Sequence, residues 1–247
     1  MHGHGRSSDD FLFLEDHNVK VISIDLFFHK ESKIPLDRVE SNPVKWNEIL
    51  PVFEKLLEEE KIVIFHILAF SQGGRFALLL LESLPEKIKT FTLLAPDGMN
   101  NKSFYNWSSR QKIFRMLFHR WQNKPQKLQK LADRSVSLKL MRPKVRDFVY
   151  HFSSNPETML RASQTWMAFR KLQPTPSKTG EIVKNQHIPF QIIMGKYDQV
   201  IRPQQALLFL KNAGLLQEIT EIENGHDFFK PSSIEKFLPY LPFLASR

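Results

Sequence analysis

Ser71 stands where an apolar, β-branched stretch gives way to helical spacing, in the sequence AFSQGGRFALLLL that starts at residue 69. A serine at a tight strand-to-helix turn can act as a nucleophile, provided that the residues two before and two after it are small. Ala69 and Gly73 meet that requirement, with alanine in the place of the first glycine of the pattern. The alternative is a serine that caps a helix, but capping does not require the glycine pair Gly73 and Gly74.

A nucleophilic serine needs a base that removes its proton and a third group that orients the base. Asp198 follows the apolar run IIMG of residues 192–195, and His226 follows the stretch QEITEI of residues 217–222. Each side chain would therefore lie at the carboxyl end of a strand, so that folding could bring it to Ser71. Taken alone, Asp198 is equally typical of a turn. The order and placement of the three predict Ser71, His226 and Asp198 as catalytic residues.

The oxygen that becomes negative during attack on a carbonyl needs two backbone N–H donors. The first predicted donor is Gln72, directly after the nucleophile. The second is His4 or a near neighbour in the loop HGHG of residues 2–5, because its glycines let the backbone approach a ligand. The paired histidines could also suggest a metal site, but no carboxylate or third histidine lies at ligand spacing. We therefore expect neither a metal nor a cofactor.

The segments that must position these residues alternate between strands and helices. Strands are predicted for residues 19–28, 61–70, 89–95, 188–195 and 217–222, and helices for residues 46–61, 74–84, 203–213 and 232–245. Strands and helices in this rhythm predict an α/β fold with a mostly parallel sheet covered by helices on both faces.

From residue 99 to residue 186, basic and aromatic residues at helical spacing replace the strand pattern. We therefore predict a discontinuous α/β core of residues 1–98 and 187–247, interrupted by an all-helical cap of residues 99–186. Residues 101–186 carry 18 Lys or Arg against four Asp or Glu, whereas the whole chain has a net charge of +9. Such a segment could face nucleic acid, an anionic membrane or an anionic substrate, or it could be a solvated helical surface.

The composition is that of a globular protein, with 42% hydrophobic and 25% charged residues over 247 positions. The chain has no cysteine, which excludes disulfides, thiolate metal sites and cysteine nucleophiles. Neither a signal peptide nor a long apolar span is visible. We expect a cytoplasmic protein that acts on a small molecule, with no transmembrane segment and no nucleic-acid partner. The sequence leaves the oligomeric state open.

Four motifs together resemble the α/β-hydrolase superfamily, in its cap-bearing branch. They are HGHGRSSDDF from residue 2, AFSQGGRFAL from residue 69, GKYDQVIRP from residue 195 and NGHDFF from residue 224. The resemblance implies the α/β-hydrolase fold, the catalytic and oxyanion residues predicted above, and no cofactor. In the superfamily the HG loop follows a central strand of the sheet. The strand that should lie in the sheet between the predicted strands of residues 19–28 and 61–70 is missing from this sequence. We therefore expect an N-terminally truncated version of the fold, with further sequence upstream.

Three functions follow from these observations. The leading hypothesis is a serine hydrolase that cleaves an ester or thioester with Ser71, His226 and Asp198, acting on a small anionic or acyl substrate. The second is a lyase or carbon–carbon hydrolase with the same three residues, because the stretch SQGGRFA resembles the elbow of the menaquinone-pathway lyase. In that lyase an arginine at the position of Arg75 contacts a carboxylate-rich substrate, although arginine is also a common packing residue at a helix start. The third is a non-catalytic α/β-hydrolase-like protein whose basic segment binds anionic partners.

Overall fold

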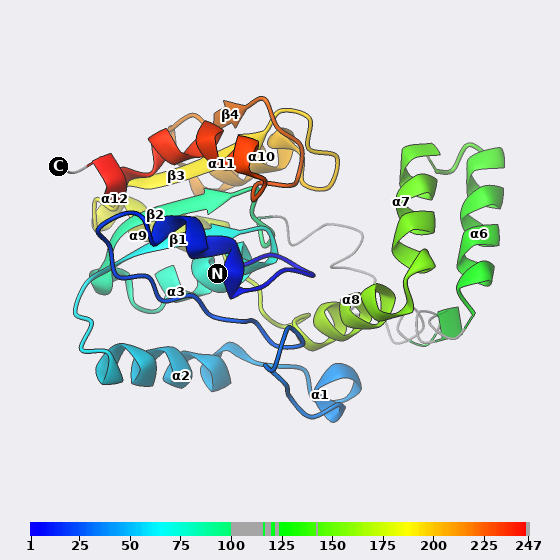
Figure 1. Cartoon of the computed structure of the whole chain (residues 1–247), viewed down its shortest axis with the longest axis horizontal. Coiled ribbons are helices and arrows are strands. Elements are labelled where there is room, and N and C mark those ends of the chain that lie inside the picture. Colours follow the sequence, from blue (N-terminus) through cyan, green and yellow to red (C-terminus); the bar gives the residue numbers. More distant parts are fainter. Residues whose placement is uncertain (100–115, 117–119, 122–123, 142, 246–247) are drawn as a thin grey trace. The chain divides into compact units, whose positions relative to one another are not determined.

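The computed structural model describes residues 1–99, 116, 120–121, 124–141 and 143–245 (Figure 1). The chain divides into two compact units. We call residues 1–26, 45–101 and 171–247 the sheet unit, and residues 27–44 and 102–170 the helical unit. The division into a core of residues 1–98 and 187–247 and a cap of residues 99–186 remains a prediction. The units differ from it in grouping residues 27–44 with the helices and residues 171–186 with the sheet.

Four parallel strands form the centre of the sheet unit. They are β1 (Phe65–Phe70), β2 (Ile88–Leu94), β3 (Phe190–Gly195) and β4 (Thr220–Ile222), and they lie in this order across the sheet. Ala69 pairs with Leu93, and Leu93 in turn pairs with Ile192. Because all four strands run in one direction, their carboxyl ends meet at the same edge. The predicted parallel sheet is confirmed.

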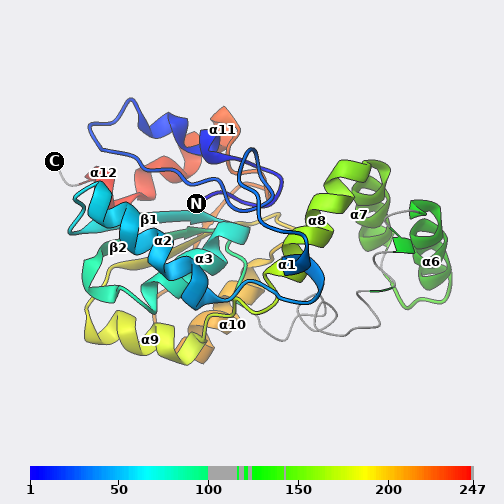
Figure 2. The same ribbon diagram turned by 90° about the horizontal axis from the view of Figure 1, so that it is seen from below.

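Helices cover both faces of this sheet. Figure 2 shows α9 (Pro176–Asn185) and α10 (Pro203–Ala213) on one side of the strands, and α11 (Pro231–Phe237) and α12 (Pro242–Ala245) on the other. Helix α3 (Gln72–Leu81) contacts α9, β1 and β2, so it belongs to the layer of α9 and α10. The remaining elements of the unit are α2 (Trp46–Glu59) and the 3-10 helices η1 (Ser8–Leu14), η2 (Pro85–Lys87) and η3 (Leu238–Tyr240).

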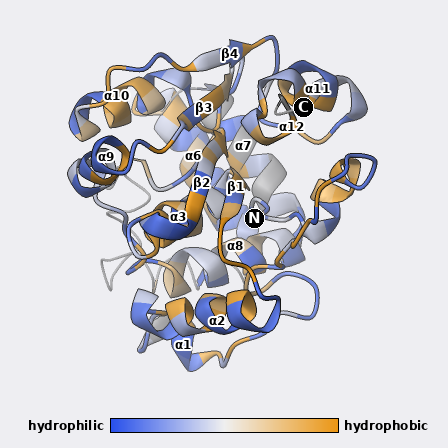
Figure 3. Ribbon diagram, turned by 90° about the vertical axis from the view of Figure 1, so that its left-hand side faces the viewer, coloured by the Kyte–Doolittle hydropathy of each residue, from blue (hydrophilic) through white to orange (hydrophobic). Residues whose placement is uncertain are grey.

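The strands are apolar because both of their faces are covered. The rings of Phe91 and Phe190 stack with their centroids 5.3 Å apart, and both side chains are buried. Figure 3 shows hydrophobic colouring along the central strands, whereas α2 carries both hydrophobic and hydrophilic residues. Helix α2 buries Ile49, Phe53 and Leu57, which recur every four residues on one side of the helix.

The helical unit contains α1 (Asp37–Glu40), α6 (Pro125–Ser137), α7 (Pro143–Ser154) and α8 (Pro156–Ala168). Helix α7 contacts both α6 and α8, and α8 also contacts α1. The Asn155 side chain caps α8 by accepting hydrogen bonds from the backbone N–H groups of Glu157 and Thr158. The helices expected in this part of the chain are present where it is described. The predicted helical stretch RQKIFRMLFHRWQNK of residues 110–124 lies mostly outside the described residues.

One predicted strand is wrong. Residues 19–26 form no strand, although their sequence is apolar and β-branched. A strand requires a neighbour that pairs with its N–H and C=O groups, and β1 is the edge of the four-stranded sheet. The next predicted strand also starts late, since β1 begins at Phe65 and not at Lys61.

Among the described residues, no helix is long and apolar enough to cross a lipid bilayer.

Candidate active site

Ser71 is the single residue between the end of β1 at Phe70 and the start of α3 at Gln72. Its backbone has φ 47° and ψ −118°, a conformation that residues other than glycine rarely adopt. The Ser71 N–H donates to the Leu94 carbonyl at 3.0 Å, and the Ser71 carbonyl accepts from the Asp97 N–H at 2.7 Å. These two bonds tie the sharp turn to the end of β2, and they hold the serine at the carboxyl edge of the sheet.

Glycine is required at positions 73 and 74 because neighbouring atoms lie close to both. A Cβ atom on Gly73 would lie 2.4 Å from the Met1 carbonyl oxygen, and one on Gly74 would lie 2.5 Å from Cβ of Pro96. Both distances are too short for any side chain. The glycines therefore let α3 start against the N-terminal loop on one side and against the end of β2 on the other.

A chain of hydrogen bonds links Ser71, His226 and Asp198. The His226 Nε2 lies 3.1 Å from the Ser71 Oγ, and the His226 Nδ1 lies 2.6 Å from the Asp198 Oδ2. The other carboxylate oxygen of Asp198 accepts from the N–H groups of Val200 and Ile201, at 2.7 and 2.9 Å. Asp198 is buried, whereas the His226 side chain is 25% exposed. The carboxylate is thus fixed by the backbone, so that one oxygen points at the imidazole.

This arrangement can transfer a proton. When Nδ1–H of His226 donates to the carboxylate, Nε2 is left without a proton and can accept the one on the Ser71 hydroxyl. The ring of His226 also lies against Phe70, with centroids 5.1 Å apart. The loops that carry His226 and Asp198 approach closely because Gly195 lacks a side chain: a Cβ there would lie 2.4 Å from the Gly225 carbonyl oxygen.

The N-terminal loop of residues 2–5 lies against the nucleophile turn. A Cβ atom on Gly3 would lie 2.7 Å from the Phe70 ring and 3.0 Å from Cβ of Ser71. His2 is fully buried, and its Nδ1–H donates to the Gly3 carbonyl while its Nε2 accepts from the Leu26 N–H. Both ring nitrogens of His2 therefore hold the loop in place. The sequence interpretation considered His2 only as one of a possible metal-binding pair, and its role in holding the loop was missed.

The predicted oxyanion donors, the backbone N–H groups of His4 and Gln72, flank Gly3 and Ser71 respectively. Their role in binding an oxyanion remains a prediction. Within the described part of the chain, no three His, Asp or Glu side chains are grouped so that they could hold a metal ion.

The Arg75 guanidinium is buried and donates hydrogen bonds to other groups of the protein. It is 1% exposed, and its Nε and Nη2 donate to the Asp97 Oδ2 at 3.0 and 2.8 Å. Its Nη1 donates to the Leu172 carbonyl at 3.0 Å. These contacts fit the packing alternative for Arg75 better than a contact with a substrate carboxylate. No role for Asp97 was predicted, because no local pattern identifies a partner 22 residues earlier in the chain.

A family-wide sequence profile described as the alpha/beta hydrolase fold matches residues 2–231. The chain therefore belongs to the α/β-hydrolase fold family. A search of curated proteins found no significant match.

Several solved structures share this fold at low sequence identity. A carboxylesterase from the ammonia-oxidizing thaumarchaeon Nitrososphaera gargenis is 16% identical, with a TM-score of 0.61 over 99% of this chain and 88% of that one. A thermophilic esterase from Thermogutta terrifontis is 15% identical, with a TM-score of 0.58 over 91% and 80% of the two chains. The 2-hydroxy-6-oxo-6-phenylhexa-2,4-dienoate hydrolase of a Rhodococcus strain is 16% identical, with a TM-score of 0.57 over 95% and 85%. At these identities the likeness establishes the fold.

Proposed function

We propose that the protein is a serine hydrolase that cleaves an ester or thioester with Ser71, His226 and Asp198. The observation that supports this proposal most strongly is the hydrogen-bonded chain from the buried Asp198 carboxylate through His226 to Ser71. The strained backbone of Ser71 adds support, because such conformations concentrate at functional sites.

In the proposed reaction the Ser71 Oγ attacks the carbonyl carbon of the substrate while the His226 Nε2 takes the hydroxyl proton. The backbone N–H groups of Gln72 and His4 bind the negative oxygen of the tetrahedral intermediate. When the intermediate collapses, the imidazolium gives its proton to the leaving alcohol or thiol, and the acyl group stays on Ser71. Water then attacks the acyl-enzyme with His226 again as base, which releases the acid and restores the serine. Asp198 keeps the imidazole in the required tautomer throughout.

The charge of the chain favours substrates that carry a carboxylate or phosphate group. Residues 101–186 have a net charge of +14, and a strongly basic segment attracts anionic ligands over several ångströms of solution. Small acyl esters remain the simplest probes, because they need little beyond the nucleophile and its base.

The test is the hydrolysis of p-nitrophenyl acetate and butyrate by the unmodified protein, by Ser71→Ala and by Ser232→Ala. Ser232 is an exposed serine on α11 and serves as the matched control. We expect turnover that Ser71→Ala abolishes and that Ser232→Ala leaves unchanged. Turnover that survives in Ser71→Ala would overturn the proposal. If Ser71 reacts with a fluorophosphonate but no ester is turned over, the carbon–carbon hydrolase or lyase alternative is favoured.

A further inference from the structure

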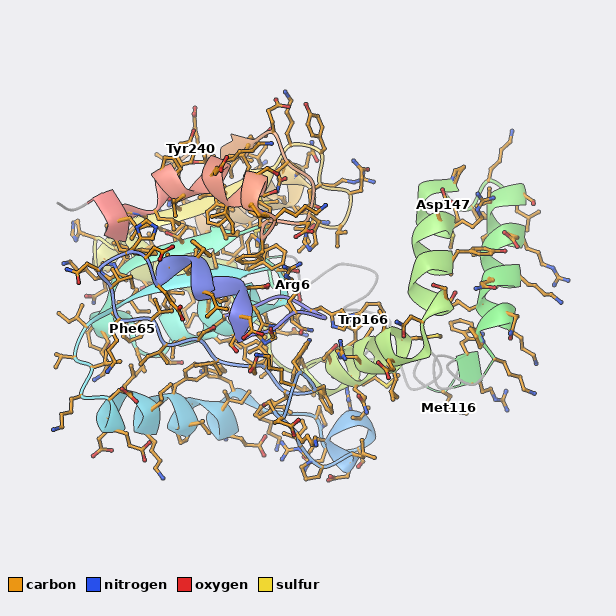
Figure 4. All side chains as sticks on the ribbon, in the orientation of Figure 1. Arg6, Phe65, Met116, Asp147, Trp166 and Tyr240 are labelled. Atoms are coloured by element: carbon orange, nitrogen blue, oxygen red, sulfur yellow. The ribbon has the colours of Figure 1, made fainter. Side chains whose placement is uncertain are left out.

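Helix α6 of the helical unit has an inner face that packs on α7. The Gln129 side chain donates to the Ser153 hydroxyl at 2.9 Å. The Tyr150 hydroxyl donates to the Asp133 carboxylate at 2.6 Å. Ala132 is buried between these two positions of the helix. Figure 4 shows other side chains of α6 extending on the side away from α7, and these form its outer face.

The outer face of α6 is basic and partly apolar. It carries Lys127, Lys130, Leu131 and Arg134, which are separated by three or four residues and so lie on one side of the helix. All four are exposed, Leu131 to 47%. Within the part of the chain that the structure describes, none of the three cations forms an ion pair. The outer face is therefore a stripe of positive charge with a leucine inside it.

The turn that ends α6 is held by its backbone. The Leu140 N–H donates to the Ser135 carbonyl at 2.8 Å, and the Lys139 N–H donates to the Val136 carbonyl at 2.9 Å. Because Lys139 has the left-handed φ of 57°, these two bonds form a Schellman motif. Leu138 and Leu140 are 69% and 79% exposed, so the turn presents two leucines to solvent at the end of the basic stripe.

The residues of this turn are not those that folding alone favours. The left-handed position of a Schellman motif favours glycine, but the chain has Lys139 there. The residue after it commonly packs an apolar side chain back on the helix, but Leu140 is exposed. Two adjacent departures from local preference, with neither side chain buried, indicate that the turn has a role outside the folded chain.

We propose that this surface binds an anionic lipid bilayer. The α6 surface, as we call it, consists of Lys127, Lys130, Leu131, Arg134 and residues 138–140. Leu138 and Leu140 enter the boundary between headgroups and acyl chains, while the cations attract the anionic headgroups. A nucleic acid would use the cations alone, because its phosphates offer no apolar layer for exposed leucines. This inference is independent of the proposed catalytic role of Ser71.

The experiment measures sedimentation of the full chain with vesicles. One set is phosphatidylcholine alone, and the other is an equimolar mixture of phosphatidylcholine and phosphatidylserine. The variants are Leu138→Ser with Leu140→Ser, Lys130→Gln with Arg134→Gln, and Lys139→Gly. The matched controls change an exposed leucine and an exposed lysine of the sheet unit, Leu216→Ser and Lys211→Gln. Binding to a DNA duplex and the midpoint of thermal unfolding are measured for each protein.

We expect the unmodified chain to bind the mixed vesicles about tenfold or more tightly than phosphatidylcholine alone, because the cations respond to surface charge. The leucine pair variant and the cation pair variant should each lose about tenfold or more of this binding. The two control variants should bind as the unmodified chain does.

The Lys139→Gly variant separates membrane binding from folding. Glycine adopts the left-handed conformation freely, so we expect this variant to unfold at a higher temperature than the unmodified chain. It should also bind the mixed vesicles about fivefold more weakly, because one cation near the bilayer surface is lost. A turn with only a structural role would gain stability and keep its affinity for the vesicles.

The proposal is overturned if the mixed vesicles bind no more tightly than phosphatidylcholine alone, or if the leucine pair variant binds them as tightly as the unmodified chain. It is also overturned if the DNA duplex binds as tightly as the mixed vesicles and the leucine pair variant keeps that binding. The α6 surface would then be a nucleic-acid site.

Discussion

At the residue scale, the backbone of Ser71 is the most unusual feature of the site. A φ of 47° in a residue with a side chain costs about 1–3 kcal/mol, which the surrounding hydrogen bonds must offset. Replacement of Ser71 by glycine removes this strain, whereas replacement by alanine keeps it, and both remove the hydroxyl. We therefore expect Ser71→Gly to exceed Ser71→Ala in free energy of unfolding by about 1 kcal/mol, measured by urea denaturation. Equal stabilities, or a less stable glycine variant, would show that the turn is unstrained.

Arg75 allows a test between packing and substrate binding. Replacement by methionine removes a buried guanidinium and leaves Asp97 and the Leu172 carbonyl without its hydrogen bonds. We expect Arg75→Met to lower the free energy of unfolding by about 2–4 kcal/mol, with Arg75→Lys in between because lysine cannot form the paired bonds to Asp97. If Arg75→Met instead keeps full stability and raises KM only for carboxylate substrates, Arg75 contacts the substrate and our assignment is wrong.

At the element scale, α3 depends on the glycines that let it start against neighbouring backbone. Alanine usually favours a helix over glycine by about 1 kcal/mol, but a Cβ on Gly73 would press on the Met1 carbonyl. We expect Gly73→Ala to lower the thermal midpoint, with a loss of about 1–3 kcal/mol. Gly225→Ala is the control, because a Cβ there meets no atom within 4 Å. A Gly73→Ala variant as stable as Gly225→Ala would contradict the close approach.

Where both ends of an element carry clear sequence signals, its first and last residues could be predicted correctly. Helix α10 covers residues 203–213 as predicted, because Pro203 opens it and Gly214, at φ 65°, closes it. Such signals could not decide whether residues 19–28 form a strand. An apolar, β-branched pattern indicates that a segment can be a strand, but it does not show whether a partner lies beside it.

The proximity of Ser71, His226 and Asp198 could be predicted because each follows a strand in a parallel sheet, where the strand ends converge. The contacts of His2 with Leu26 could not, since no local pattern identifies which distant backbone group a buried histidine will bind. The same limit applies to the pair of Arg75 and Asp97.

At the scale of the whole molecule, the buried Met1 amino group links stability to pH. Its pKa is about 5 in the folded chain, lowered by burial, and about 8 when the chain is unfolded. Between these values the unfolded chain binds more protons than the folded chain, so the free energy of unfolding rises as the pH rises from 5 to 8. The full effect of this one group is at most about 4 kcal/mol.

The measurement compares unfolding of the unmodified chain and of an N-terminally acetylated chain across this pH range. Acetylation removes the titrating group and leaves every other ionisable side chain in place. We expect the unmodified chain to lose stability relative to the acetylated one as the pH falls from 8 to 5, with little further change below 5. Parallel profiles for the two chains would mean that the amino group is solvated.

The central claim concerns three side chains in the sheet unit, Ser71, His226 and Asp198, and it predicts that the serine is activated by the histidine. The most direct measurement is the rate of fluorophosphonate labelling at Ser71, mapped by mass spectrometry, in the unmodified chain, in His226→Asn and in His187→Asn. His187 is exposed and provides the matched control. We predict rapid labelling at Ser71 that falls by about 100-fold or more in His226→Asn and is unchanged in His187→Asn. No labelling of Ser71 in the folded protein, or labelling that does not depend on His226, would contradict the account.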